Sequence, residues 1–197
     1  EWLAECDLPE GAFSILPCAN EHAAPLIEDD RIAVLSFTGG LVGWDLKARA
    51  GKKRVVLELG GNAACLVDAD PGADLGHVAA RLVAGAYGQA GQSCISVQRL
   101  IVHRAVLPAL RERLVEAVRA LPCGDPRDER TVVGPMISAA AAARLDAAID
   151  SAIAAGATAL VRGSRDDSHP SLLGPTLLED VPRDHPLYRD EAFGPVL

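Results

Sequence analysis

The run Ile32-Ala33-Val34-Leu35-Ser36-Phe37, which Thr38-Gly39-Gly40 interrupts, decides the fold. It is continuously apolar and contains β-branched residues, as does a strand that is buried on both faces of a parallel sheet. After the glycines we expect a helix from about Val42 to Ala50 and then a strand from Arg54 to Leu59. Strand, helix and strand in this order predict a βαβ unit with a right-handed parallel crossover. The sequence therefore predicts an α/β fold.

The same alternation continues to the end of the chain. Apolar runs and helical periodicity predict strands at 64–67, 97–102 and 158–161, helices at 75–87 and 107–121, and extended chain at 175–181 and 193–197. Ser138 is a candidate cap for a further helix, which Gly156 would end. We also expect a short strand from Ala12 to Leu16 and a polar loop from Arg162 to Leu173.

The composition is that of an ordinary globular protein. Hydrophobic residues make up 49% and charged residues 23% of the chain, which disfavours disorder. The formal net charge of −8 disfavours nucleic acid or an anionic membrane as a partner. No apolar run approaches the ~18 residues of a membrane span.

The cysteines and histidines indicate neither a disulfide framework nor a metal centre. The five cysteines are an odd number, widely spaced and without a C-x-x-C pair, which fits a reducing cytoplasm. The five histidines show no H-x-x-x-H spacing. We therefore expect no bound metal and a cytoplasmic protein.

Four short blocks carry the candidate chemistry: Thr38-Gly39-Gly40, Glu58-Leu59-Gly60-Gly61, Gly91-Gln92-Ser93-Cys94 and Glu191-Ala192-Phe193-Gly194-Pro195. Taken singly, each has an ordinary structural explanation. A lone cysteine is more often a small buried hydrophobe than a nucleophile, and a carboxylate at a strand end is more often salt-bridged than catalytic. In this order, however, the blocks resemble the aldehyde dehydrogenase superfamily over essentially the whole chain.

The resemblance implies a Rossmann-like, parallel-sheet aldehyde dehydrogenase fold that is only partly present. Residues 1–61 would be the C-terminal part of the NAD(P)-binding domain. Residues 62–197 would be the catalytic domain, incomplete at its C-terminus. When full length, the protein would be a homo-oligomer, as is usual in the family.

The resemblance also implies catalytic roles for Cys94 and Glu58. Cys94 would attack the carbonyl carbon of an aldehyde, and the resulting thiohemiacetal would pass a hydride to NAD or NADP and leave a thioester. Glu58 would activate the water that hydrolyses this thioester or help to deprotonate the thiol. The backbone N–H of Cys94 would be one oxyanion donor. The asparagine that provides a second donor in the family is not in this sequence.

Further residues are implied to bind the cofactor: Thr38, Gly39, Gly40, Leu59, Gly60, Glu191 and Phe193. Thr38-Gly39-Gly40 would lie beside the pyrophosphate, at the N-terminus of the helix that follows. Gly40 departs from the family, which usually has a serine there. Glu191 would bind the hydroxyls of the nicotinamide ribose, and Phe193 would pack beside that ribose.

Two alternatives to an aldehyde-oxidising enzyme stay open. The chain could be a non-catalytic fragment that packs with a partner, or a CoA-acylating aldehyde dehydrogenase in which CoA replaces water. Ser93 is not the arginine of members that use phosphorylated aldehydes, so a phosphorylated substrate is not supported. The sequence leaves the aldehyde and the choice between NAD and NADP open, because the strand end that reads the ribose 2′ position would lie before Glu1.

Overall fold

The computed structural model describes residues 2–70, 72, 74–166 and 168–197. The chain divides into two compact units, Glu1–Leu59 and Gly60–Leu197. The division falls two residues before the boundary that the sequence suggested. The assignment of residues 1–61 to a cofactor domain and 62–197 to a catalytic domain stays a prediction.

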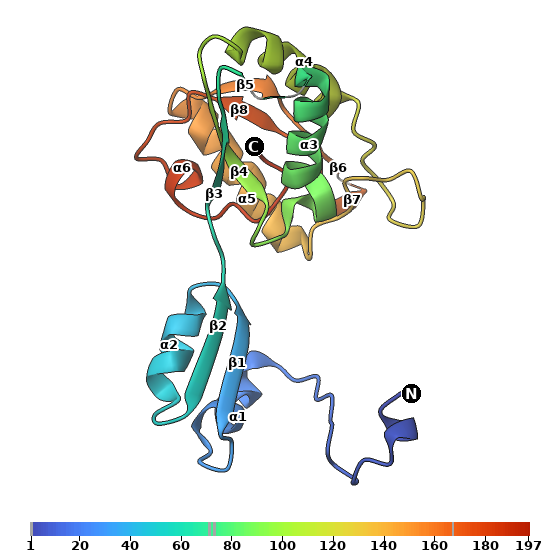
Figure 1. Ribbon diagram of the computed structural model, residues 1–197, viewed down its shortest axis with the longest axis vertical. Helices are drawn as coiled ribbons and strands as arrows, with labels where there is room; N and C mark the ends of the chain where they lie inside the picture. The colour runs from blue at the N-terminus through green and yellow to red at the C-terminus, as the bar shows by residue number, and fades with distance from the viewer. Residues whose placement is uncertain (1, 71, 73, 167) are drawn as a thin grey trace. The chain divides into compact units, whose positions relative to one another are not determined.

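The first unit contains a βαβ motif. Strand β1 (Val34–Gly39) pairs in parallel with β2 (Arg54–Leu59), and helix α2 (Val42–Arg49) connects them along one face of the pair (Figure 1). The predicted strand, helix and strand are thus confirmed. Ahead of the motif lie helix α1 (Ala24–Glu28) and the 3-10 turns η1 (Ala4–Cys6) and η2 (Asn20–His22).

Only one face of this strand pair is covered. Burial alternates along both strands, and the half-buried side chains, such as Phe37, share the face that meets α2. Gly43 lets the helix come close, since a Cβ there would lie 2.5 Å from Leu59 Cδ2. On the other face Val34 and Val56 are 52% and 49% exposed. The expected burial of the first strand on both faces is therefore wrong for this unit, because α2 provides a single layer.

The second unit is a mixed α/β structure. Its helices are α3 (Leu75–Tyr87), η3 (Gly88–Gly91), α4 (Leu107–Arg119), α5 (Ala139–Ala154) and α6 (Pro186–Arg189). Its strands pair in twos: β3 (Ala63–Val67) with β4 (Val97–Val102) in parallel, and β5 (Thr158–Val161) with β8 (Leu177–Glu179) and β6 (Arg165–Asp166) with β7 (His169–Leu173) in antiparallel.

Two apolar clusters form the core of this unit. The first lies between α3, α4 and the β3–β4 pair, and its fully buried side chains include Tyr87, Leu110 and Val118. The spacing that predicted an amphipathic helix at 107–121 is thus confirmed. The second cluster joins α5 to β7 and to the C-terminal segment, where Ala192 and Val196 are buried. Figure 1 shows the chain ending inside this unit, where Leu178 N donates to Leu197 O at 2.8 Å.

Local signals set most of the boundaries correctly. Ser138 caps α5 as predicted, because its Oγ accepts from Ala141 N at 3.1 Å. The strand expected at Ala12–Leu16 is wrong, since no strand among the described residues pairs with this segment and its apolar side chains are exposed. The loop expected at Arg162–Leu173 is also wrong, because its two halves pair as the β6–β7 hairpin and bury Leu173.

The hydroxyl of Tyr87 ties α3 to the segment before β8. The side chain is fully buried, and its hydroxyl donates to the Thr176 carbonyl oxygen at 2.7 Å. Burial raises the pKa of this phenol far above its usual value, so the hydroxyl stays a donor. Thr176 O also accepts from Leu197 N at 3.1 Å.

We expect Tyr87→Phe to lower the free energy of unfolding by about 1 kcal/mol, the net worth of one buried hydrogen bond whose acceptor keeps another partner. Urea unfolding followed by circular dichroism measures it. Tyr188→Phe is the matched control, since no hydrogen bond of its hydroxyl occurs within the described residues, and it should change the value by less than about 0.5 kcal/mol. An equal loss in both variants would contradict this role for Tyr87.

Candidate active site

The predicted residues of the first unit lie together at the carboxyl ends of its two strands. The parallel register pairs Thr38 with Glu58 and Gly39 with Leu59. Thr38 and Glu58 are exposed, and the alternation along the strands places them on the face away from α2. The carboxyl ends of parallel strands are where open α/β sheets bind ligands.

The two glycines at the end of β1, Gly39 in the strand and Gly40 directly after it, have different surroundings. A Cβ at Gly39 would lie 2.6 Å from Phe37 Cζ, so the ring of Phe37 occupies the space that a side chain would need. A Cβ at Gly40 would meet nothing within 4 Å. Packing within the unit therefore accounts for Gly39, while the space at Gly40 is open.

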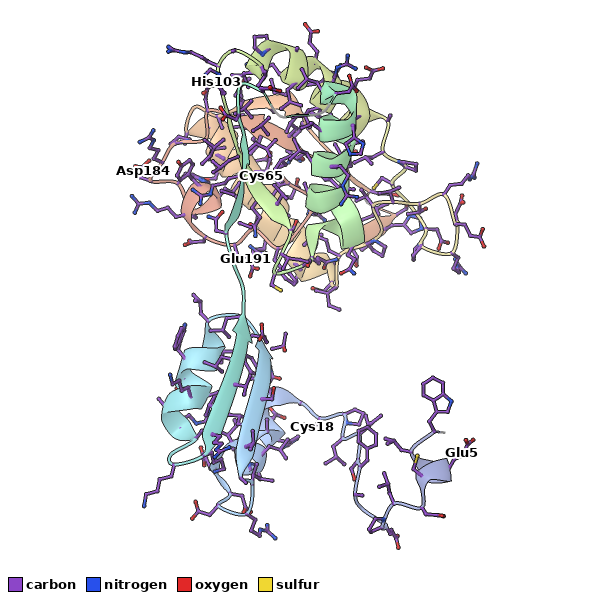
Figure 2. All side chains as sticks on the ribbon, viewed as in Figure 1. Glu5, Cys18, Cys65, His103, Asp184 and Glu191 are labelled. Atoms are coloured by element: carbon purple, nitrogen blue, oxygen red, sulfur yellow. The ribbon has the colours of Figure 1, made fainter. Side chains whose placement is uncertain are left out.

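In the second unit, Glu191 lies against the glycine pair that follows β2. Its Oε1 accepts from Gly61 N at 3.0 Å, and a Cβ added at Gly60 would overlap its carboxylate. Figure 2 shows Glu191 beside this stretch of chain. The two glycines thus form a cradle for the carboxylate that any side chain at position 60 would fill.

Cys94 lies in a tight turn that contacts the same glycine pair. Ser96 N donates to Ser93 O at 3.0 Å, which closes the turn, and the Cys94 side chain is exposed. A Cβ at Gly61 would lie 3.2 Å from the Cys94 carbonyl oxygen. Gly61 therefore touches both the Cys94 turn and the Glu191 carboxylate.

The backbone ahead of Cys94 is left-handed at three successive residues. The φ angles of Gln89, Ala90 and Gly91 are 53°, 55° and 66°. For the two residues with a Cβ this conformation costs about 1 kcal/mol each. It directs Gly91 onto the loop that follows Glu191, where a Cβ on Gly91 would overlap the Gly194 carbonyl.

Gln92 fixes the Cys94 turn from another side. Its Oε1 accepts from Ile137 N at 2.8 Å, and its Nε2 donates to Pro135 O at 3.4 Å. The sequence reasoning missed this residue, although it lies two positions before the candidate nucleophile. A polar side chain inside a motif that otherwise consists of small residues was the available signal.

Asn62 and Phe193 lie close in sequence to the glycine pair and to Glu191. Asn62 Nδ2 donates to Tyr188 O at 2.9 Å, so this amide ties the glycine turn to the end of α6. Phe193 follows Glu191 closely, has a positive φ of 50° and is 38% exposed. It departs from the extended conformation that the sequence predicted for 193–197, because the chain bends here before Val196 bridges to Thr176.

The five cysteines differ in their surroundings. Cys6, Cys18, Cys94 and Cys123 are exposed, whereas Cys65 on β3 is half-buried and packs against the first core cluster. Burial of part of the Cys123 side chain raises the pKa of its thiol. Exposure alone therefore does not single out Cys94, and its distinction is the turn and the neighbours described above.

Other site types have little support. A cavity of about 480 Å³ in the second unit is lined mainly by apolar side chains of β4, α4 and β8 and includes neither Cys94 nor Glu191. Across residues 2–70, 72, 74–166 and 168–197, no group of three or more His, Cys, Asp or Glu side chains could hold a metal ion. No helix in this described part is long and apolar enough to cross a membrane.

The predicted site residues thus form two groups. Thr38, Gly39, Glu58 and Leu59 lie at the strand ends of the first unit, and Gly40 follows them directly. Gly60, Cys94 and Glu191 lie around one glycine turn in the second unit, and Phe193 follows two residues after Glu191. The two expected catalytic residues, Glu58 and Cys94, accordingly belong to different units.

Comparisons with known proteins agree with the motifs. The family model described as the aldehyde dehydrogenase family matches residues 1–197. An aldehyde-dehydrogenase-like protein of Sinorhizobium fredii is 38% identical over 99% of this chain and 37% of its own length. The succinate semialdehyde dehydrogenase Sad of Escherichia coli is 35% identical over 98% of this chain and 42% of its own. The chain spans about two fifths of these relatives.

Solved structures show the same fold. Aldehyde dehydrogenase 21 of Physcomitrella patens, in complex with the reaction product succinate, has a TM-score of 0.90 and 46% identity over 96% of this chain and 39% of its own. A glyceraldehyde-3-phosphate dehydrogenase of Methanocaldococcus jannaschii, complexed with NADP, has a TM-score of 0.91 and 35% identity over 98% of this chain and 42% of its own. The Rossmann-like fold expected from the sequence is confirmed.

The close approach of Gly91 to Gly194 predicts a sharp difference between two neighbouring glycines. Gly91→Ala should lower the free energy of unfolding by more than about 2 kcal/mol, because a Cβ would overlap the Gly194 carbonyl in an already left-handed backbone. Gly88→Ala is the matched control: a Cβ there meets nothing within 4 Å, and we expect a change below about 0.5 kcal/mol. Urea unfolding distinguishes the two, and equal effects would show that the contact is unimportant.

Proposed function

Because this chain belongs to the aldehyde dehydrogenase family, we propose that it serves the oxidation of an aldehyde to a carboxylic acid with NAD or NADP as hydride acceptor. The observation that carries this proposal is the arrangement around Gly61. This residue contacts the turn that presents the exposed Cys94, and its N–H binds the carboxylate of Glu191. The candidate nucleophile and a candidate cofactor ligand thus lie against the same glycine.

The residues present fit a nicotinamide cofactor. The cradle of Gly60 and Gly61 admits the Glu191 carboxylate only because position 60 has no side chain. A carboxylate held in this way can accept hydrogen bonds from the two hydroxyls of a ribose, with Phe193 packed beside the sugar. Thr38, Gly39, Gly40, Leu59 and Gly60 would complete the contacts, those after β1 toward the pyrophosphate. When bound, the nicotinamide accepts the hydride.

The chemistry that we assign to the chain begins at Cys94. Its sulfur, as the thiolate, attacks the carbonyl carbon, and the backbone N–H of Cys94 donates to the oxygen that becomes negative. Loss of hydride from that carbon restores the carbonyl and leaves a thioester on the sulfur. Glu58 then takes a proton from water, which attacks the thioester and releases the acid and the Cys94 thiol.

The names of the relatives suggest where a search for the aldehyde should begin. Several are called succinate-semialdehyde dehydrogenases, one is called an aspartate-semialdehyde dehydrogenase and others 3-sulfolactaldehyde dehydrogenases. These substrates share a short chain and an acidic group besides the aldehyde. We take short acidic aldehydes as the first substrate class to test. A cytoplasmic homo-oligomer stays a prediction.

The role of each catalytic residue can be separated by the timing of product formation. In the full-length gene product, Cys94→Ala should form no reduced cofactor with succinate semialdehyde. Glu58→Gln should form about one equivalent per site in a burst and then turn over at least about 100-fold more slowly, because the thioester waits for activated water. Stopped-flow measurement of reduced cofactor distinguishes the two.

The same experiment tests the alternatives. A burst from Cys94→Ala would contradict the nucleophile. Unchanged turnover of Glu58→Gln would contradict the assigned base. Restored turnover of Glu58→Gln with CoA, together with an acyl-CoA product, would establish the CoA-acylating enzyme. No reduced cofactor from the wild type with any aldehyde of the class would favour the non-catalytic reading.

The thiol itself can be tested on the 197-residue chain. With limiting iodoacetamide at neutral pH, we expect Cys94 to be alkylated before the other cysteines, as peptide mapping would show. Cys6 and Cys18 are the matched controls because they are equally exposed but lie outside the assembled turn. Cys65, half-buried, and Cys123, whose pKa burial raises, should react last. Equal labelling of Cys6, Cys18 and Cys94 would mean that this chain alone does not activate the thiol.

A further inference from the structure

The side chain of Gln98 on β4 connects two parts of the candidate site. Its Nε2 donates to Gly61 O at 2.7 Å, and its Oε1 accepts from Ala192 N at 2.7 Å. One amide group therefore hydrogen-bonds both the glycine turn and Ala192, the residue after Glu191. Ala192 lies 94 positions from Gln98 in the sequence. Only an amide of this length offers a donor and an acceptor from one planar group.

These contacts close a ring around Glu191. Gly61 uses its N–H to bind the Glu191 carboxylate at 3.0 Å, and its C=O to bind Gln98. Gln98 in turn holds the N–H of Ala192, the residue that directly follows Glu191. Both ends of Glu191, its carboxylate and its peptide link to Ala192, are thus tied to the same glycine turn.

We infer that Gln98 is a positioning residue that holds the Glu191 carboxylate in place for the ribose of the cofactor. This inference rests on the proposed function for the identity of the ligand. Gln98 acts through Glu191 and the glycine turn, since both polar atoms of its amide are used in the bridge.

A second contact shows why the bridge matters. Arg144 of α5 donates to Ala192 O at 3.0 Å, and Ala192 itself is buried in the second core cluster. These interactions fix Ala192 against the core but do not reach the glycine turn. Apart from the Glu191 carboxylate itself, Gln98 links the turn to Ala192, and Asn62 links the turn to Tyr188 O at the end of α6. Of these two side chains, Gln98 holds the residue next to Glu191.

Without Gln98, two polar groups would also lose their partners. Ala192 N and Gly61 O would then have to hydrogen-bond water while partly buried. A buried polar group that lacks a good partner costs more free energy than one hydrogen bond contributes to folding. The loop would then sample more positions. Ordering Glu191 would use part of the free energy of cofactor binding, so the affinity for the cofactor would fall. The expected effect is on cofactor affinity more than on the chemical step.

Three variants test the bridge. Gln98→Met has nearly the same length but neither polar atom. Gln98→Glu keeps an acceptor for Ala192 N and loses the donor to Gly61 O. Thr131→Val is the control, since it removes a hydrogen bond of 2.7 Å to Asp125 O in a distant loop.

Two readouts are needed, and the first does not require activity. Site-resolved amide hydrogen exchange on the chain should show Ala192 N–H exchanging at least about tenfold faster in Gln98→Met than in the wild type, and near the wild-type rate in Gln98→Glu and Thr131→Val. In the full-length gene product, both Gln98 variants should raise the KM for NAD(P) about tenfold. The KM for the aldehyde and kcat should change less than about twofold.

The outcomes separate the inference from the proposed function. Unchanged Ala192 exchange in Gln98→Met would overturn the bridge. A rise of both KM values together, or a fall in kcat alone, would overturn the role toward the cofactor. If the wild type oxidises no aldehyde, the proposed function fails, while exchange at Ala192 still decides whether Gln98 holds the loop.

Discussion

The contact of Gly91 with Gly194 is the constraint on which the candidate site depends. The two backbones lie so close that a Cβ on Gly91 would overlap the Gly194 carbonyl. Gly194 in turn packs against α5, since a Cβ on Gly194 would overlap the side chain of Leu145. The chain reaches this contact through the left-handed residues before Gly91. The loop that contains Cys94 therefore packs against the loop that contains Glu191, and the Glu191 loop packs against the core.

The core and the site are continuous. Ala192 and Val196 are buried in the same cluster as Leu145, so the loop that presents Glu191 is anchored on both sides of the bend at Phe193. The two candidate side chains remain accessible, since Cys94 is exposed and Glu191 is only half-buried. Holding reactive groups on a packed scaffold lowers the cost of ordering them when a ligand binds.

Sequence reasoning succeeded where the cause was local. The periodicity of α4 and the cap at Ser138 depend on neighbours a few residues away, and both were predicted. The β6–β7 hairpin was missed because its strands are defined by their pairing with each other, which the polar composition of the segment does not indicate. The Gln98 bridge was missed for the same reason, since its two partners lie 37 and 94 residues away. The motifs located Cys94 and Glu191, but only the folded chain reveals what holds them.

The two glycines at the end of β1 show how the requirements of the motif and of packing can be separated. The ring of Phe37 occupies the space that a side chain at position 39 would need, so packing alone requires Gly39 whether or not a cofactor binds. Packing does not require a glycine at position 40, because the Cβ of a serine there would meet nothing within 4 Å. The departure from the family's usual serine is therefore not steric. It removes one hydroxyl that could donate to a pyrophosphate. The hydroxyl of Thr38, which is exposed and lies beside Glu58 in the register, is then the side-chain donor that we propose at this strand end.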